Sequence, residues 1–166
     1  MEKQDNPLSS GKIEMKYMTA KEEDILTNTN YIQKGIVLDK LLEALIVSDI
    51  KYNDLILGDK NALLIAARIL GYGKEYSFSI TNPQNNEKEQ FTIDLTTIKD
   101  EYIEAKNLKE EGVNEFEFNL PTAKTNLTFK LLTHGDEKNL NKELEGLRKI
   151  KKDFIPEATT RLKYMI

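Results

Sequence analysis

Leu-Gly-Asp-Lys-Asn-Ala-Leu-Leu-Ile-Ala-Ala-Arg-Ile-Leu-Gly-Tyr-Gly-Lys-Glu-Tyr, residues Leu57 to Tyr76, carries the signals of a complete helix. Asp59 is a residue type that caps a helix start, because its carboxylate accepts from the free N–H groups of the first turn. The residues that follow are apolar nearly all the way round, which predicts a buried helix. Gly71 and Gly73 permit the positive φ with which helices end.

Arg68 is the one charge inside this apolar run. Two interpretations are open. In the first, which we favour, the aliphatic part of the side chain lies along the helix surface and the guanidinium reaches solvent. In the second, the guanidinium pairs with an acidic residue. Neither interpretation involves catalysis.

The composition describes an ordinary domain with a strongly charged surface. The chain has 166 residues, of which 39% are hydrophobic and 31% charged, and its net charge is −4. Phosphate binding needs a basic face, so nucleic acid is not expected as a partner. The basic run from Arg148 to Lys152 is better explained as a helix end, where cations complement the macrodipole.

The sequence has no cysteine, which excludes disulfides, thiol catalysis and cysteine-ligated zinc. No apolar run reaches the roughly 18 to 20 residues of a membrane helix, so no membrane partner is expected. The first seven residues lack the hydrophobic core of a signal peptide, and we expect a cytoplasmic product.

The N-terminal part combines an arm with a group of helices. Residues 1–18 are predicted as an arm followed by an edge strand over Lys12–Met18, where charged and apolar residues alternate. Residues 19–74 are predicted as a subdomain of about three helices, with a polar break over 27–30. Thr19 and Glu22 have the spacing of a capping box.

Glu22, Glu23 and Asp24 crowd the first turn of that first helix. A carboxylate cluster is also compatible with acid–base chemistry or a metal. The helix dipole explains the cluster more simply, because it favours negative charge at this end.

Residues 75–132 are predicted as a β-hairpin subdomain. Clean alternation over 76–80 and 91–95 indicates one hairpin with a long polar tip, and 115–120 with 127–132 indicates a second. Residues 133–166 are predicted as C-terminal helices, the first capped by the turn at 133–136. The apolar pattern of the last helix extends as far as Ile166, so we expect this helix to continue beyond that residue.

The fold class is therefore predicted as α+β, with an N-terminal helical bundle, two hairpins in a small antiparallel sheet and C-terminal helices. The common phosphate-binding, zinc-protease and nucleophile-elbow motifs are absent from the sequence. His134 as a general base lacks an organised partner, and turn chemistry explains it better. A metal-dependent hydrolase built on Asp24, Asp59 and Asp136 remains the weakest alternative, since these acids are explained as caps and turns.

Several strings, spread over nearly the whole chain, resemble the baseplate proteins of T-even-type contractile-tailed phages, in particular the group tied to the baseplate hub and its assembly. They are Pro7–Glu14, Tyr17–Leu26, Gly58–Leu63, Arg68–Tyr76, Leu131–Glu137 and Thr160–Ile166. In many members of that family a cysteine pair at the first hairpin tip implies a zinc site. The tip here reads Thr81-Asn82-Pro83-Gln84-Asn85-Asn86, so no cofactor is expected.

The resemblance implies a non-enzymatic hub subunit or hub-assembly factor. Its partners would be other phage baseplate hub proteins, with self-association as a further expectation. It would be found in the host cytoplasm during assembly, or in the virion tail baseplate. The residues expected to bind partners are Glu22, Glu23, Arg68, Tyr72, Tyr76, Phe118 and Phe129.

An alternative from another class is a small ligand-binding or regulatory module of the host. Such a module needs a pocket with converging polar groups. The sequence offers for this only Arg68 and the pair Tyr72 and Tyr76.

Overall fold

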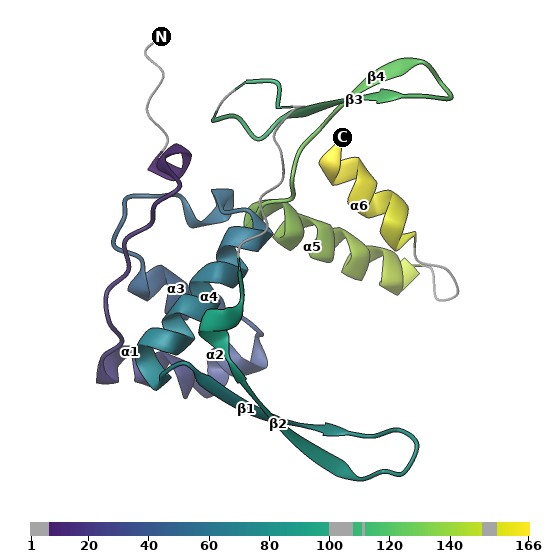
Figure 1. Cartoon of the computed structure of the whole chain (residues 1–166). Coiled ribbons are helices and arrows are strands. Elements are labelled where there is room, and N and C mark those ends of the chain that lie inside the picture. The colour runs from purple at the N-terminus through teal and green to yellow at the C-terminus, as the bar shows by residue number, and fades with distance from the viewer. Residues whose placement is uncertain (1–6, 100–107, 111, 151–155) are drawn as a thin grey trace. The chain divides into compact units, whose positions relative to one another are not determined.

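The computed structural model describes residues 7–99, 108–110, 112–150 and 156–166. These residues form an α+β fold, as predicted (Figure 1). The helices are α1 (Ala20–Leu26), α2 (Thr29–Gln33), α3 (Val37–Leu45), α4 (Leu57–Tyr72), α5 (His134–Ile150) and α6 (Glu157–Met165). The strands are β1 (Glu75–Thr81), β2 (Lys88–Asp94), β3 (Phe116–Leu120) and β4 (Thr125–Phe129). Three short 3₁₀ turns are η1 (Pro7–Ser10), η2 (Tyr52–Asp54) and η3 (Leu95–Thr97).

The chain divides into two compact units that interleave along the sequence. Unit 1 comprises Met1–Glu14, Ser48–Lys60 and Glu104–Ile166, and unit 2 comprises Met15–Val47 and Asn61–Ile103. These units differ from the four consecutive segments expected from sequence, because segments distant along the chain pack together.

The helical part of unit 2 contains one helix more than predicted. Residues 27–30 were expected to be a polar break, but Asn28 caps a short helix, α2, by accepting from the N–H of Tyr31 at 3.1 Å. The expected edge strand over Lys12–Met18 is also wrong. Only Met15 forms a bridge, to Ile46, because α3 ends there and offers the carbonyl of Leu45. The buried apolar residues of unit 2 are Leu41, Leu42, Leu45, Ala67 and Leu95.

Helix α4 forms as predicted, but it is longer at both ends than the predicted caps imply, and its burial differs. It begins at Leu57, so Asp59 lies in the first turn instead of capping it. Gly71 is helical, and a Cβ there would lie 2.6 Å from the Cε of Met18. Gly73 alone takes the positive φ, 82°, that ends the helix. The prediction of a fully buried helix is wrong, since only Ala67 in α4 is buried.

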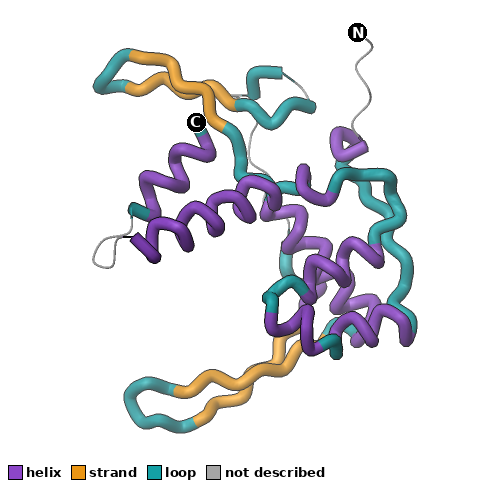
Figure 2. Tube along the Cα trace, turned by 180° about the vertical axis from the view of Figure 1, so that it is seen from behind, coloured by secondary structure: helices purple, strands orange, loops and turns teal. Residues whose placement is uncertain are grey.

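The two hairpins form separate two-stranded antiparallel sheets, β1–β2 and β3–β4, coloured as strands in Figure 2. In β1–β2, Tyr76 lies opposite Ile93 and Phe78 opposite Phe91. In β3–β4, Phe116 lies opposite Phe129 and Phe118 opposite Leu127. The second hairpin closes earlier than predicted, with a four-residue turn over 121–124, because Lys124 adopts a positive φ of 52°.

Unit 1 is built around the start of α5. The N–H of Leu57 donates to the carbonyl of Leu132, and the N–H of His134 donates to that of Leu55. These bonds tie the segment before α4 to the segment before α5. The buried apolar residues of unit 1 are Leu55, Leu132, Leu140 and Leu144. None of the described helices has the length and hydrophobicity that crossing a bilayer requires.

Candidate protein-binding surfaces

Arg68 organises the corner between α4 and β1. Its guanidinium donates to the carbonyl of Gly73 at 3.0 Å and to that of Glu75 at 3.2 Å. It also lies over the rings of Tyr72 and Tyr76, 5.2 and 5.7 Å from their centroids. Within the described residues Arg68 pairs with no acid, so that interpretation is wrong, whereas its exposed hydrogen bonds agree with a guanidinium that reaches the surface. The two backbone carbonyls that it binds there were not expected. The structure does bring together three of the predicted partner-binding residues, Arg68, Tyr72 and Tyr76.

An apolar face of β1–β2 continues from this corner. Tyr76 stacks on Phe78 at 5.9 Å between ring centroids, and Phe78 stacks on Phe91 at 5.8 Å. We call this surface the aromatic face, formed by Tyr76, Phe78, Ile80, Phe91 and Ile93. Four of the five side chains are more than 40% exposed, which is unusual for neighbouring large apolar residues.

The far end of the aromatic face contains a shallow hollow of about 360 Å³. Its lining residues are Ile80, Asn82, Pro83, Gln84, Glu89 and Phe91. Such a hollow, apolar with an amide and a carboxylate at its rim, has the character of a site for one anchoring side chain of another protein.

The tip of this hairpin does not fit a zinc site. The side chain of Asn82 accepts from the N–H of Gln84 and donates to Glu89, while Asn85 accepts from the N–H of Glu87. These hydrogen bonds of the asparagine side chains close the turn at the place where the family resemblance implies a cysteine pair in other members. Among the described residues, no group of three or more His, Cys, Asp or Glu side chains could hold a metal.

The β3–β4 hairpin presents a second apolar face. Phe118 is 47% exposed, whereas Phe129 is half-buried and stacks on Phe116 at 5.3 Å. The two partner-binding residues predicted on this hairpin, Phe118 and Phe129, lie on the same face, since alternate residues of paired strands share a side. Phe118 is the accessible one, and Phe129 supports the hairpin from within.

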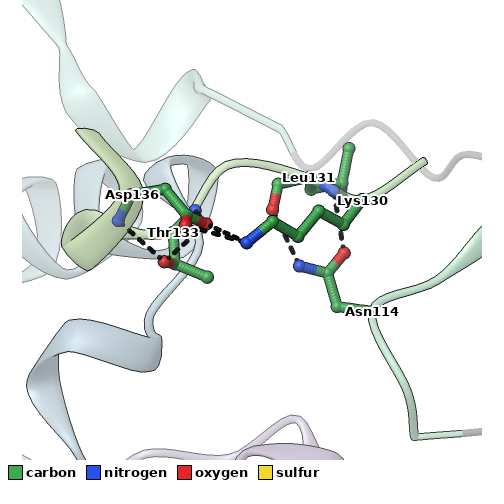
Figure 3. A network of polar contacts seen from close by, with 5 residues as sticks. All are labelled: Asn114, Lys130, Leu131, Thr133 and Asp136. Carbon is green, nitrogen blue, oxygen red and sulfur yellow. Dashed lines mark hydrogen bonds and ion pairs between the residues drawn. The ribbon is translucent and has the colours of Figure 1, made fainter. Parts of the chain in front are cut away.

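A polar network fixes the base of β3–β4 to α5 (Figure 3). The side-chain amide of Asn114 donates to the carbonyl of Leu131 and accepts from its N–H, at 2.8 and 2.9 Å. Lys130 binds both carboxylate oxygens of Asp136 at 2.8 Å. The N–H and hydroxyl of Thr133 donate to the same carboxylate, and Thr133 in turn accepts from the N–H of Asp136. This is the predicted cap of α5.

Burial works against the charged carboxylate of Asp136, but the bonds from Lys130 and Thr133 outweigh it and lower its pKa. The Asn114 and Lys130 contacts were not expected. The spacing of Thr133 and Asp136 signals a capping box, but the other two partners lie on separate loops and have no local pattern.

Glu22 and Glu23 lie in different environments. Glu22 is 1% exposed, and its carboxylate binds Lys16 at 2.8 Å and accepts from the N–H and hydroxyl of Thr19. The bonds from Lys16 and Thr19 lower the pKa of Glu22 to about 2. Glu22 therefore lies in the interior, unavailable at the surface, whereas Glu23 is exposed.

His134, the candidate general base, begins α5 with structural contacts. Its Nδ1 lies 3.2 Å from the Nζ of Lys60, and its ring meets the edge of Tyr52 at 4.8 Å. These neighbours hold η2 and the start of α4 against α5. The arrangement resembles a packing contact more than a nucleophile and its base.

The described residues thus define a small α+β protein in which both hairpins carry exposed apolar side chains. A family model described as T4 bacteriophage base plate protein matches residues 1–144. The chain belongs to that family, as its sequence strings indicated. No curated protein and no solved structure matches it.

Proposed function

We propose that this chain is a non-enzymatic subunit or assembly factor of the phage baseplate hub, acting through protein–protein contacts. The observation that supports this function is the exposure of the aromatic face of β1–β2 and of Phe118 on β3–β4, in a member of a baseplate family. A two-stranded hairpin is marginally stable alone, so a face of this kind gains stability when a partner covers it. The chain acts in the host cytoplasm during assembly or in the tail baseplate.

Phe118 is the central contact residue of the β3–β4 face in this proposal. The hairpin's base is held by the Asn114 and Asp136 bonds, so Phe118 is presented on a fixed support. Burying one exposed phenylalanine at an interface contributes about 1.5–3 kcal/mol. A lysine at this position would instead place a charge in the contact.

The test compares two lysine substitutions on opposite faces of the same hairpin. Phe118→Lys is expected to reduce capture of co-expressed hub subunits at least roughly tenfold, the equivalent of about 1.4 kcal/mol. Thr128→Lys adds the same charge to the other face, opposite Glu117, and is expected to bind as the wild type does. A folded Phe118→Lys chain that still captures hub subunits would contradict the contact.

Subunit and assembly factor are distinguished by where the chain is found. Quantitative mass spectrometry of purified virions, beside the infected-cell lysate, measures this directly. Stoichiometric amounts in the virion identify a structural subunit, and abundance in the lysate alone identifies an assembly factor. Absence from both would contradict the hub proposal.

A further inference from the structure

Among the described residues, no strand lies beside the outer edge of β1, and the register of the hairpin determines which backbone groups face outward there. At one end of the hairpin the N–H of Leu95 donates to the carbonyl of Lys74, and at the other the N–H of Asn82 donates to that of Glu87. Bonded and non-bonded pairs alternate along an antiparallel ladder. The even-numbered residues of β1 therefore bond to β2, and the odd-numbered ones direct their N–H and C=O groups away from it.

Ser77 and Ser79 lie at the centre of this outward row. The carbonyl of Glu75 is already occupied by Arg68. Within the described part of the chain, the backbone of residues 76–81 makes no hydrogen bond outside the β1–β2 ladder. Figures 1 and 2 show the hairpin extending beyond the helices of its own unit, with this edge uncovered by them. Such a row of free donors and acceptors is a template for another strand.

The edge of β1 lacks the protection that the other described strands have. Residues 76–80 include no charge and no proline, the usual blocks to edge pairing. Strand β2 carries Lys88, Glu89 and Asp94, and Glu89 shares the aromatic face. Strand β3 already has a bridge from Leu108 on Phe116, and the segment after β4 donates from Lys130 to the carbonyl of Met165.

We propose that β1 pairs antiparallel with β1 of a second copy of this chain, about a two-fold axis at Phe78. This register places Ser77 opposite Ser79 of the second copy, so the outward donors and acceptors of both strands meet. Tyr76 lies opposite Ile80 of the second copy, and the two Phe78 residues face each other. Glu75, the only charge in β1, lies opposite Thr81 of the second copy, so no like charges are paired.

The self-complementary pattern is what selects a second copy as the partner. A two-fold interface uses the same patch on both subunits, so each residue must suit its symmetric counterpart. Around Phe78 the apolar residues meet apolar residues and the serines meet serines. In a β2–β2 pairing, by contrast, Glu89 would face Ile93 of the second copy, and Asp94 is already bound to Lys74 and Thr96.

Pairing joins the two β1–β2 hairpins into one four-stranded sheet. The stacked rings of Tyr76, Phe78 and Phe91 then continue across the axis into the same rings of the second copy. Cross-strand aromatic pairs stabilise antiparallel sheets, most closely at non-bonded positions such as Phe78. A hairpin that is marginal alone becomes part of a sheet large enough to be stable.

The test measures the oligomeric state of the full chain by sedimentation equilibrium over a concentration series. The wild type is expected to show a monomer–dimer equilibrium. Ser79→Pro removes one outward N–H and leaves the β1–β2 ladder intact, so it is expected to raise the dimer Kd at least roughly tenfold. Gln90→Pro is the matched control, since Gln90 lies opposite Ser79 and directs its N–H outward from β2. It is expected to leave the Kd unchanged.

A pair of double variants tests the register and does not depend on proline. Ser77→Lys with Ser79→Lys places lysines opposite each other and is expected to be monomeric. Ser77→Glu with Ser79→Lys places opposite charges together and is expected to restore the dimer, with a Kd that rises in high salt.

A wild type that stays monomeric up to roughly 1 mM overturns the proposal, and so does a folded Ser79→Pro chain that dimerises like the wild type. Equal dimerisation of both double variants overturns the register. Self-association through β1 is measured without any hub protein, whereas the Phe118→Lys experiment measures hub capture, so either property can fail alone.

Discussion

Single residues in this chain act mainly by satisfying backbone groups where elements meet. Glu22 does so at the start of α1, where it receives bonds from Thr19 and Lys16 although it is almost completely buried. From sequence Glu22 was expected to complete a capping box with Thr19, which the structure confirms, and also to bind a partner. The structure makes it an internal anchor that holds the segment before α1 onto the helix, so its effect is expected on stability and not on binding.

Glu22→Gln is expected to destabilise the chain in a pH-dependent way. The folded-state pKa of Glu22 is lowered from 4.5 to about 2, chiefly by the bond from Lys16, so its stabilising effect is complete above 4.5. It is lost as the pH falls from about 4.5 towards about 2, because in this range the unfolded chain binds a proton at this carboxyl while the native chain still holds it ionised. The measurement is urea unfolding of wild type and variant over that pH series.

The difference in unfolding free energy between the two chains should shrink through this window. Glu23→Gln, in the same helical turn but exposed, is the matched control and is expected to show little difference at any pH. A Glu22→Gln difference that stays constant with pH would argue against the bonded carboxylate.

At the scale of the element, the corner between α4 and β1 depends on one side chain. Gly73 ends α4 with positive φ, and Arg68 reaches from the last turns of the helix to the carbonyls of Gly73 and Glu75. The same guanidinium lies over Tyr72 and Tyr76. The direction in which the hairpin leaves the helix is therefore fixed by Arg68.

Arg68→Ala is expected to lower the free energy of unfolding by about 1–2 kcal/mol, through two lost hydrogen bonds and lost ring contacts. Arg68→Lys should recover only part of this, because an ammonium lacks the fork that spans both carbonyls. Urea unfolding measures both. Lys21→Ala, which removes an exposed charge in α1, controls for net charge, and an Arg68→Ala chain as stable as this control would contradict the assignment.

Elements with strong periodicity were predictable from sequence. Both hairpins and α3 to α5 follow from alternation and helical spacing, and the cap at Thr133 follows from its distance to Asp136. Two features were not predicted, the start of α4 at Leu57 and the short helix α2. The first depends on tertiary packing that overrides helix propensity, and the second depends on the single capping bond from Tyr31 to Asn28. Arg68's role was also not predictable, because its two acceptor carbonyls converge only once the helix has ended.

For the whole molecule, the interleaving of the two units determines which fragments of the chain contain a complete core. The core of unit 1 needs Leu55 from the 48–60 segment as well as Leu140 and Leu144 from α5. Backbone bonds join the same two parts through Leu57 and His134. Gly135 lies so near Asn53 that a Cβ there would be 3.2 Å from the carbonyl oxygen of Asn53, and the two segments therefore pack tightly.

A fragment of residues 104–166 is accordingly expected to lack a cooperative unfolding transition, because the segment that carries Leu55 is missing. Joining residues 48–60 to it through a flexible linker should restore the transition. Thermal unfolding followed by circular dichroism compares the two fragments. Equally cooperative melting of both would show that the 48–60 segment is dispensable for unit 1.

The same interleaving also imposes an order on folding during synthesis. The residues of unit 2 have all left the ribosome once position 103 has emerged, while unit 1 still lacks α5. The 48–60 segment must then wait for a partner that lies at least 70 positions downstream, as the bridge from Ile56 to Thr133 shows. Long-range closure of this kind is slow, so the apolar surface around Leu55 is uncovered longest in a newly made chain, when nascent-chain chaperones have access to it.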